Sequence, residues 1–299
     1  MAISCFTSVY IIYYIVVGQK LRKITTILSK ESQLENPSLS ALEEDITRLL
    51  RERKEELEKI EKLERHRREF LGNVSHEMKT PLFHIQGYVS TLSENNIDDP
   101  ELYKRYLDRT DKSIERLIRI LEDLDTISQL ETKEFSDEME PFDIVELCRE
   151  VLESEELDAE NKNISLLLKN EQPKMAVIGD RFRIRQVLLN LVVNSIRYGK
   201  KDGETSINLK NNSDSIIIEV ADNGIGIGPE HLSRLFERFY RVDKGRSREQ
   251  GGTGLGLSIV KHILEAHHQT IKVMSTLGAG SVFSFHLKKG PHHSSFSTQ

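Results

Sequence analysis

The first 19 residues differ from the rest of the chain because they carry no charged side chain. Ile, Val, Tyr and Phe dominate the stretch from Ile3 to Val17, and a helix of about 19 residues reaches about 28 Å, close to the roughly 30 Å of a hydrocarbon core. Lys20, Arg22 and Lys23 follow directly, which by the positive-inside rule places the rest of the chain in the cytoplasm. We therefore predict a transmembrane segment over residues 1–19, and expect no room for an extracellular sensor domain before it. A buried core helix is one alternative. A signal peptide is another, although its charges should precede the apolar run.

The charged region that follows has an apolar repeat with alternating spacings of four and three residues. A break comes first, over Glu31–Ser40, where Asn36-Pro37 and several serines stand. The repeat positions are Leu42, Ile46, Leu49, Arg53, Glu56, Ile60, Leu63, Arg67, Phe70 and Val74. Seven of these ten positions are apolar, which predicts a juxtamembrane linker and parallel coiled coil over residues 20–68. A single solvated charged helix is the alternative.

Two amphipathic helical patterns come next and predict a hairpin over residues 69–133. The first runs from Leu71 to Leu92 and the second from Leu102 to Leu130, and the polar segment Glu94–Pro100 separates them. Each pattern has one apolar stripe, so a lone hairpin would leave apolar surface in water. We therefore expect two hairpins to pair as a four-helix bundle, which makes the protein a homodimer.

One histidine lies off the apolar stripe of the first hairpin helix. At about 100° per residue, His76 points some 200° away from both Val74 and Met78, so it faces solvent rather than the bundle core. An imidazole is largely neutral at cytoplasmic pH, which leaves one ring nitrogen free to attack an electrophile. Glu77 can hold the opposite N–H and take the proton, and Thr80 lies one turn on, where its hydroxyl can orient a water.

The segment Ser75–Leu82 resembles the phosphoacceptor box of the bacterial sensor histidine kinases, S-H-E-x-K-T-P-L. The resemblance implies that His76 is phosphorylated, that Glu77 is the base, and that Thr80 supports phosphatase activity. Pro81 cannot donate to the carbonyl of Glu77, which loosens the helix and permits a bend there.

After Glu140 the long helices give way to alternating strands and helices, which predicts one mixed sheet covered on one face by helices. The expected strands are Ile164–Lys169, Met175–Ile178, Ile207–Lys210, Ile216–Ala221, Ile271–Ser275 and Ser281–Leu287. The expected helices are Ile144–Glu156, capped by Asp143, Arg181–Tyr198 and Leu255–Ala266.

The helix that ends at Tyr198 carries polar groups suited to a charged ligand. Asn190 and Asn194 are four residues apart and share a face, and their amide oxygens suit Mg²⁺. Arg197 adds a cation for phosphate and Tyr198 an aromatic plane for a base. Taken alone, two asparagines on a helix can equally face solvent.

Two glycine clusters follow. Asp222 stands at a strand end before Gly224 and Gly226, where a carboxylate can accept from an exocyclic amine and glycines allow a ring to approach closely. Gly252-Thr253-Gly254-Leu255-Gly256 opens a helix, and its backbone N–H groups can bind phosphates. Neither cluster fits a Rossmann or P-loop pattern, and no H-R-D with a later D-F-G indicates a eukaryotic-type protein kinase.

In order along the chain, four segments are similar to the N, G1, F and G2 boxes of the histidine-kinase catalytic domain. They are Asn190–Tyr198, Asp222–Gly226, Leu235–Tyr240 and Gly252–Gly256. The resemblance implies an α+β multidomain protein with a Bergerat-type α/β sandwich ATP-binding domain over residues 139–288. It implies ATP and Mg²⁺ as cofactors, with Asn194 on the metal, and a mobile lid between Gly228 and Gly251.

Three positions depart from the family pattern. Arg197 stands where the family more often has Lys, and Ser195 replaces the commoner Ala. His268-Gln269 occupies the place of a Gly-Gly turn, which we expect to strain the backbone before the next strand. None of these changes removes a catalytic group.

Composition and net charge limit the classes of partner that the protein can bind. The chain has 299 residues and a formal net charge of −6, which argues against a nucleic-acid-binding protein. Its two cysteines build no disulfide framework.

The resemblance implies a sensor kinase in the bacterial cytoplasmic (inner) membrane that passes its phosphoryl group to a receiver-domain aspartate of a response regulator. An ATPase of the gyrase and chaperone group and an ATP-binding sensor scaffold without kinase activity are the alternatives. Residues 289–299 are expected to form a disordered tail.

Overall fold

The computed structural model describes residues 18–20, 39–94, 99–131, 139–242 and 252–291. The chain divides into two units, residues 1–71 and 72–299, which are described separately. The apolar residues 1–17 of the predicted transmembrane segment lie outside the described ranges. Within those ranges, no helix combines the length and the apolar character that crossing a bilayer requires.

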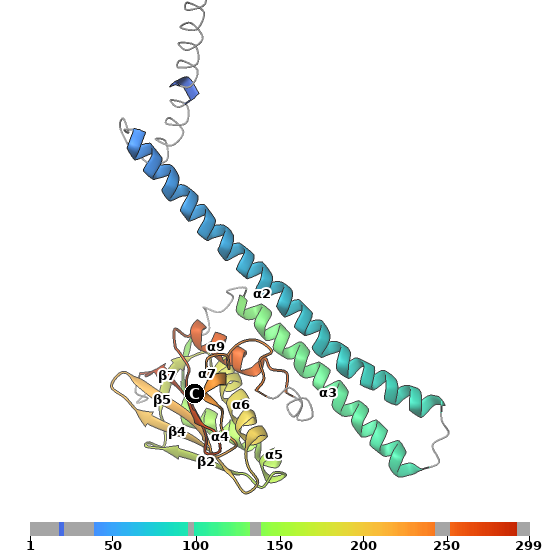
Figure 1. The fold of residues 1–299 in the computed structure, drawn as a ribbon. Helices are drawn as coiled ribbons and strands as arrows, with labels where there is room; N and C mark the ends of the chain where they lie inside the picture. The colour runs from blue at the N-terminus through green and yellow to red at the C-terminus, as the bar shows by residue number, and fades with distance from the viewer. Residues whose placement is uncertain (1–17, 21–38, 95–98, 132–138, 243–251, 292–299) are drawn as a thin grey trace, which may run out of the picture. The chain divides into compact units, whose positions relative to one another are not determined.

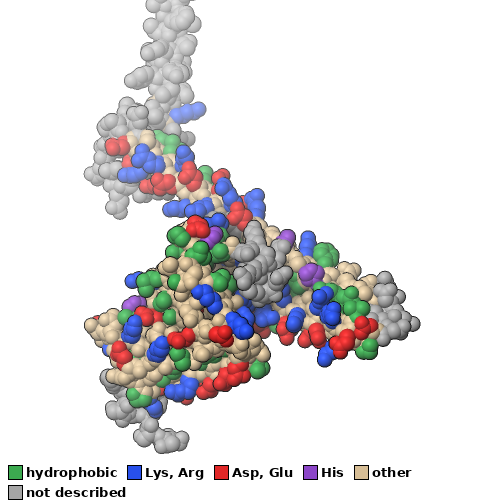
Figure 2. Space-filling model, turned by 60° about the horizontal axis from the view of Figure 1, so that its bottom comes forward, with side chains coloured by type: hydrophobic (Ala, Val, Ile, Leu, Met, Phe, Trp, Pro, Cys, Tyr) green, Lys and Arg blue, Asp and Glu red, His purple; other side chains and the backbone are tan. Residues whose placement is uncertain are grey.

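The first unit is described mainly through the amino-terminal half of α2 (Leu39–Glu94). The helix begins at Leu39, at the end of the predicted break. Ion pairs three or four residues apart cover its surface, among them Arg48 with Asp45 at 2.7 Å and Arg68 with Glu64 at 2.8 Å. Figure 2 shows side chains of both charges mixed along this helix. Ile60 and Leu63, two positions of the predicted coiled-coil seam, are 48% and 68% exposed in the single chain.

The second unit begins with the predicted helical hairpin (Figure 1). The carboxyl-terminal part of α2 packs against α3 (Pro100–Glu131), and the rings of Tyr88 and Tyr106 lie 5.7 Å apart. The carboxylate of Asp99 caps α3 by accepting from the backbone N–H of Glu101 at 3.0 Å. Helix α2 continues through Pro81, so the expected weak point lies inside a continuous helix.

The carboxyl-terminal part of the second unit alternates helices and strands. Its helices are α4 (Ile144–Ser154), α5 (Glu156–Glu160), α6 (Arg181–Tyr198), α7 (Pro229–Leu232) and α9 (Gly256–Ala266). Its strands are β1 (Glu140–Asp143), β2 (Ser165–Asn170), β3 (Ala176–Gly179), β4 (Glu204–Asn211), β5 (Ser215–Asp222), β6 (Lys272–Thr276) and β7 (Gly280–Lys288). The bounds of α6 are those expected from the sequence.

Five strands form one mixed sheet in the order β2-β4-β5-β7-β6. The β2–β4 pair is parallel and the other pairs are antiparallel. Helices α4, α6 and α9 cover one face (Figure 1). The mixed sheet with helices on one face is therefore confirmed.

The expectation of a single sheet was wrong for β3, which pairs with β1 in a separate two-stranded sheet. The physical reason lies at Asp143, whose carboxylate accepts from the backbone N–H groups of both Val145 and Met175 at 3.0 Å. One side chain thus caps α4 and joins the start of β3 to the end of β1.

The core lies between the helical layer and the sheet. Val187, Leu188 and Leu191 of α6 are fully buried, as are Ile218 of β5 and Phe285 of β7. Burial of such side chains contributes about 1.5–3 kcal/mol each. This packing fixes α6 against β5, and the carboxyl-terminal ends of both elements lie at the cavity described next.

Candidate functional site

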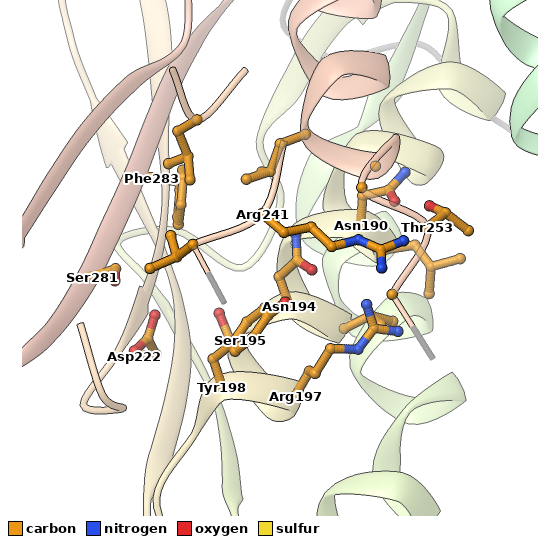
Figure 3. Close-up of a pocket in the computed structure, with 18 of the residues that line it drawn as sticks. Asn190, Asn194, Ser195, Arg197, Tyr198, Asp222, Arg241, Thr253, Ser281 and Phe283 are labelled. Carbon is orange, nitrogen blue, oxygen red and sulfur yellow. The ribbon is translucent and has the colours of Figure 1, made fainter. Parts of the chain in front are cut away.

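A cavity of about 640 Å³ lies between α6, the end of β5 and the two glycine clusters, with α3 on one side (Figure 3). Most of the residues singled out from the sequence of this region line it, namely Asn190, Asn194, Arg197, Tyr198, Asp222, Gly226, Gly252, Thr253, Gly254 and Gly256. Gly224 and Leu255 are not part of the lining, because Gly224 is buried and Leu255 is fully buried.

One face of α6 forms the floor of the cavity. The carboxylate of Asp180 caps the helix by accepting from the N–H of Arg183 at 3.0 Å. At the opposite end, Lys162 Nζ donates to the carbonyls of Ile196 and Arg197 at 3.1 Å, which places a cation at the negative end of the helix. Capped at both ends, α6 holds Asn190 and Asn194 one turn apart on the cavity side.

Three arginines meet at one end of the cavity. Arg119, Arg197 and Arg241 all line it. Burial lowers the pKa of Arg197, and the positive charges of Arg119 and Arg241 act in the same direction. Glu122 and Asp123 also line the cavity, and the charges of Arg119 and Arg197 act to lower the pKa of Asp123. The guanidinium groups are the donors at this end that suit an anion.

Asp222 lies at the other end, at the last residue of β5 (Figure 3). Its carboxylate accepts from the N–H of Gly224 at 2.8 Å and from the backbone of Ser281, while burial raises its pKa. A Cβ at Gly224 would collide with the carbonyl oxygen of Tyr198, and Gly226 has a φ of +65° with no space for a Cβ beside Thr276. Glycine is therefore required at both positions.

The second glycine cluster leads into the amino terminus of α9. Gly254 has a φ of +77°, and a Cβ at Gly256 would lie 2.5 Å from the Asn190 amide oxygen. The Thr253 hydroxyl accepts from the N–H of Leu255 at 3.1 Å and donates to the Asp123 carboxylate at 2.7 Å. The loop thus passes directly over α6 with its backbone at the cavity.

Asp123 is a cavity residue that the sequence reasoning missed. It lies on α3, and burial raises its pKa to about 6 despite the hydrogen bond from Thr253, which acts in the opposite direction. Asp123 and Thr253 are 130 residues apart, so only a tertiary contact reveals the pair. No local sequence signal predicts it.

The three hairpin residues singled out from the sequence, His76, Glu77 and Thr80, lie outside the lining of the cavity. His76 is exposed, as its angular position on the helix predicted. Glu77 does not hold the imidazole here, because its carboxylate accepts from Arg116 at 2.8 Å and from Arg241 at 2.9 Å. The Thr80 hydroxyl donates to the carbonyl of His76 at 3.2 Å, a common bond for threonine within a helix.

The aromatic segment before the second glycine cluster is ordered by local contacts. The N–H of Phe239 donates to the carbonyl of Gly254 at 2.8 Å, and the Tyr240 hydroxyl lies 2.8 Å from His231 Nδ1. The guanidinium of Arg234 stacks over the Tyr240 ring at 4.5 Å. These contacts tie the start of the predicted lid to the core, and lid residues 243–251 lie outside the described ranges.

Two family models match the chain. The phospho-acceptor domain of His Kinase A matches residues 66–133. The histidine kinase-, DNA gyrase B- and HSP90-like ATPase domain matches residues 179–291. The second description covers several classes of ATPase, and the phospho-acceptor match ahead of it singles out one of them. The chain belongs to the two-component sensor histidine kinases.

Curated members of this family are similar to the chain in sequence. The chain is 35% identical over 224 residues to the phosphate regulon sensor protein PhoR of Haemophilus influenzae, which covers 75% of this chain and 52% of that protein. It is 35% identical over 236 residues to the sensor-like histidine kinase SenX3 of Mycolicibacterium smegmatis, covering 78% and 60%. The chain therefore spans little more than half the length of these sensor kinases.

Solved structures of sensor kinases agree with the fold. The Acinetobacter baumannii histidine kinase AdeS matches with a TM-score of 0.58 and 28% identity, over 72% of this chain and 98% of that one. The histidine kinase ThkA, solved in complex with the response regulator protein TrrA, matches with a TM-score of 0.59 and 26% identity, over 86% of this chain and 69% of that one.

Proposed function

We propose that this protein phosphorylates itself on His76 from ATP and passes the phosphoryl group to an aspartate of a response regulator. Two features of this sensor-kinase chain support the proposal together. One is an exposed histidine beside a carboxylate, and the other is a cavity with a carboxylate at one end and cations at the other. An adenine nucleotide has the matching polarity, because its base carries an amine and its other end is anionic.

The polar groups that line the cavity support ATP as its ligand. Asp222 accepts the adenine amine, with Tyr198 beside it. Asn190, Arg197 and the backbone from Gly252 to Gly256, including Thr253, hold the phosphates. The glycines leave the backbone of both clusters open to the ligand, since side chains at Gly226 and Gly254 would be strained and would meet neighbouring backbone.

Asn194 is the candidate metal ligand. Its side chain lines the cavity between the Asp222 end and the arginines (Figure 3), and none of the hydrogen bonds recorded for the described residues engages its amide. An amide oxygen suits Mg²⁺, which retains several waters and takes few protein ligands. Bound Mg²⁺ supplies charge neutralisation on the transferring phosphates.

In the chemical step, a neutral nitrogen of His76 attacks the γ-phosphorus of ATP. A nitrogen–phosphorus bond forms, the bond from phosphorus to the bridging oxygen breaks, and ADP leaves with that electron pair. The proton on the opposite ring nitrogen passes to Glu77, whose carboxylate here accepts from Arg116 and Arg241 and must first turn toward the imidazole. Because His76 does not line the cavity, transfer also requires the hairpin and the nucleotide to approach each other.

Membership of the family supports the rest of the proposal. The phosphoryl group leaves for a receiver-domain aspartate, and Thr80 supports the reverse dephosphorylation by orienting water. Exposed apolar residues on the hairpin, such as Leu82 at 55% and Ile118 at 49%, support a four-helix bundle in a homodimer. The uncharged residues 1–19, followed by basic residues, support anchoring in the bacterial cytoplasmic membrane.

Nucleotide-dependent labelling of the full chain tests the proposal. With γ-labelled ATP and Mg²⁺ the protein should take up label. In a separate binding measurement, Asp222→Asn should weaken ATP binding at least tenfold, because the amine of the base loses its charged acceptor. Asp214→Asn, in an exposed turn outside the cavity, is the matched control and should bind as the wild type does. An Asp222→Asn variant that binds ATP like the control would contradict the assignment of the cavity.

A further inference from the structure

Ser195 is a buried hydroxyl at the cavity that the site described above does not use. The residue is 3% exposed on α6 and lines the cavity. Serines within helices commonly donate to the carbonyl four residues earlier. The Ser195 Oγ has no hydrogen-bond partner among the described residues. A buried hydroxyl without a partner is unfavourable, so a group that supplies one stabilises the protein.

Two other buried serine hydroxyls of the fold have hydrogen-bond partners. Ser258 Oγ donates to the carbonyl of Leu255 at 2.7 Å, and Ser281 Oγ lies 2.9 Å from Ser275 Oγ. Within the described residues, Thr205 is the other buried hydroxyl that has no partner, and it does not line the cavity. Ser195 therefore combines burial, an unused donor and a position facing the ligand space.

The position of Ser195 indicates which part of a nucleotide it meets. Figure 3 shows it with Asp222, Tyr198, Ser281 and Phe283 at one end of the cavity, away from Thr253 and the arginines. Among the described residues, the arginines that line the cavity are grouped at the opposite end, and Lys200, whose charge lowers the pKa of Asp222, is not part of the lining. An end with few polar groups and no lining cation suits a base rather than phosphates. Ser195 and Asp222 offer one donor and one acceptor there.

We propose that the Ser195 hydroxyl donates a hydrogen bond to a ring nitrogen of adenine next to the amine that Asp222 accepts. The proposal rests on the proposed function, because it takes ATP as the ligand. Adenine carries acceptor nitrogens on both sides of its amine-bearing carbon, at N1 and N7. A carboxylate and a hydroxyl donor side by side match that pattern. In guanine, a carbonyl replaces the amine and would face the carboxylate of Asp222, so Asp222 disfavours guanine while Ser195 adds a hydrogen bond to adenine.

Binding of ATP, 1-deaza-ATP and 7-deaza-ATP to the full chain and its Ser195→Ala variant tests this proposal. Ser195→Ala should weaken ATP binding about 3- to 10-fold, the effect of one neutral hydrogen bond. The loss should vanish with the analogue that lacks the accepting nitrogen. Thr205→Val, which removes the unpartnered hydroxyl outside the cavity, is the matched control and should leave ATP affinity unchanged.

The melting temperature of the protein without nucleotide gives a second test, which does not depend on affinity. Without nucleotide, Ser195→Ala should unfold at a higher temperature than the wild type, because it removes a buried unbonded hydroxyl. Equal affinity of the variant and wild type for ATP, or an equal loss for all three nucleotides, would overturn the proposal. Failure of the wild type to bind ATP, or an Asp222→Asn variant with unchanged affinity, would instead overturn the proposed function.

Discussion

Arg241 donates a hydrogen bond of 2.9 Å to the carboxylate of Glu77, the residue that follows the exposed His76. Arg116 holds the same oxygen at 2.8 Å, and all three side chains are at most 12% exposed. Arg241 also lines the cavity proposed to bind the nucleotide. One guanidinium therefore contacts the proposed base and lines the space proposed for the phosphates, and we expect a bound anion to compete with Glu77 for it.

Replacement of Arg241 should weaken nucleotide binding. Arg241→Gln removes a buried cation beside the phosphate end, and the loss of a charged hydrogen bond corresponds to roughly tenfold or more in affinity. Titration calorimetry with ATP on the full chain measures the effect. Arg181→Gln, which breaks an exposed pair with Glu150 away from the cavity, is the control. Equal affinity of the two variants for ATP would show that Arg241 does not meet the nucleotide.

Asp123 should make the folded state less stable at neutral pH than at mildly acidic pH. Its pKa of about 6 in the folded protein exceeds the usual value of about 4. The folded state therefore binds a proton more readily than the unfolded state, and stability falls as pH rises through 4 to 6. Asp123→Asn should raise the free energy of unfolding at pH 7.5 by about 2 kcal/mol.

Urea denaturation at pH 7.5 and pH 5 distinguishes this effect. The gain from Asp123→Asn should shrink at pH 5, where the wild-type carboxyl is largely protonated. Asp108→Asn, at an exposed position of the same helix, should show neither the gain nor its dependence on pH. A gain of the same size at both pH values would argue against a titrating Asp123.

His267 should stabilise the fold in its neutral form. Its Nε2 accepts from the N–H of Asp180 at 3.0 Å, and its Nδ1 donates to the carbonyl of Ile263 at 2.8 Å. Burial lowers its pKa, so its contribution is complete above the usual value of about 6.5 and is lost as pH falls below that value. His267→Gln should cost about 1–2 kcal/mol at pH 7.5, measured by denaturation, and the cost should diminish at pH 5. A cost that grows on acidification would reverse this interpretation.

His268 follows α9 with a φ of +56°, as the replacement of a Gly-Gly turn led us to expect. A residue with a Cβ is strained in this region, whereas glycine is not. His268→Gly should stabilise the protein by about 0.5–1 kcal/mol, seen as a higher melting temperature. His268→Ala keeps the Cβ and should not gain. If the glycine variant were less stable than the alanine variant, the backbone at His268 would not be strained as proposed.

The elements with strong periodicity could be predicted from sequence, and so could the local part of the site. Helix α6 matches its expected bounds, because the Asp180 cap and the spacing of its apolar residues are local signals. The exposure of His76 followed from helix geometry alone. Strand β1 has only four residues and includes Pro141, so its pairing with β3 left no detectable pattern.

Long-range contacts explain what the sequence could not show. The Thr253–Asp123 bond and the hold of Arg241 on Glu77 join segments more than a hundred residues apart. The sequence marks Ser195 only as a departure from the family pattern, because the lack of a partner for its hydroxyl depends on the tertiary packing around α6. Tertiary packing, rather than local spacing, determines these features.

The chemical nature of the label taken from γ-labelled ATP tests the central claim most directly. We predict label that is lost in acid, is stable in base and is absent from His76→Gln, while that variant still binds ATP. Label that persists in His76→Gln, or ATP turnover without any protein-bound label, would contradict the account and indicate an ATPase instead.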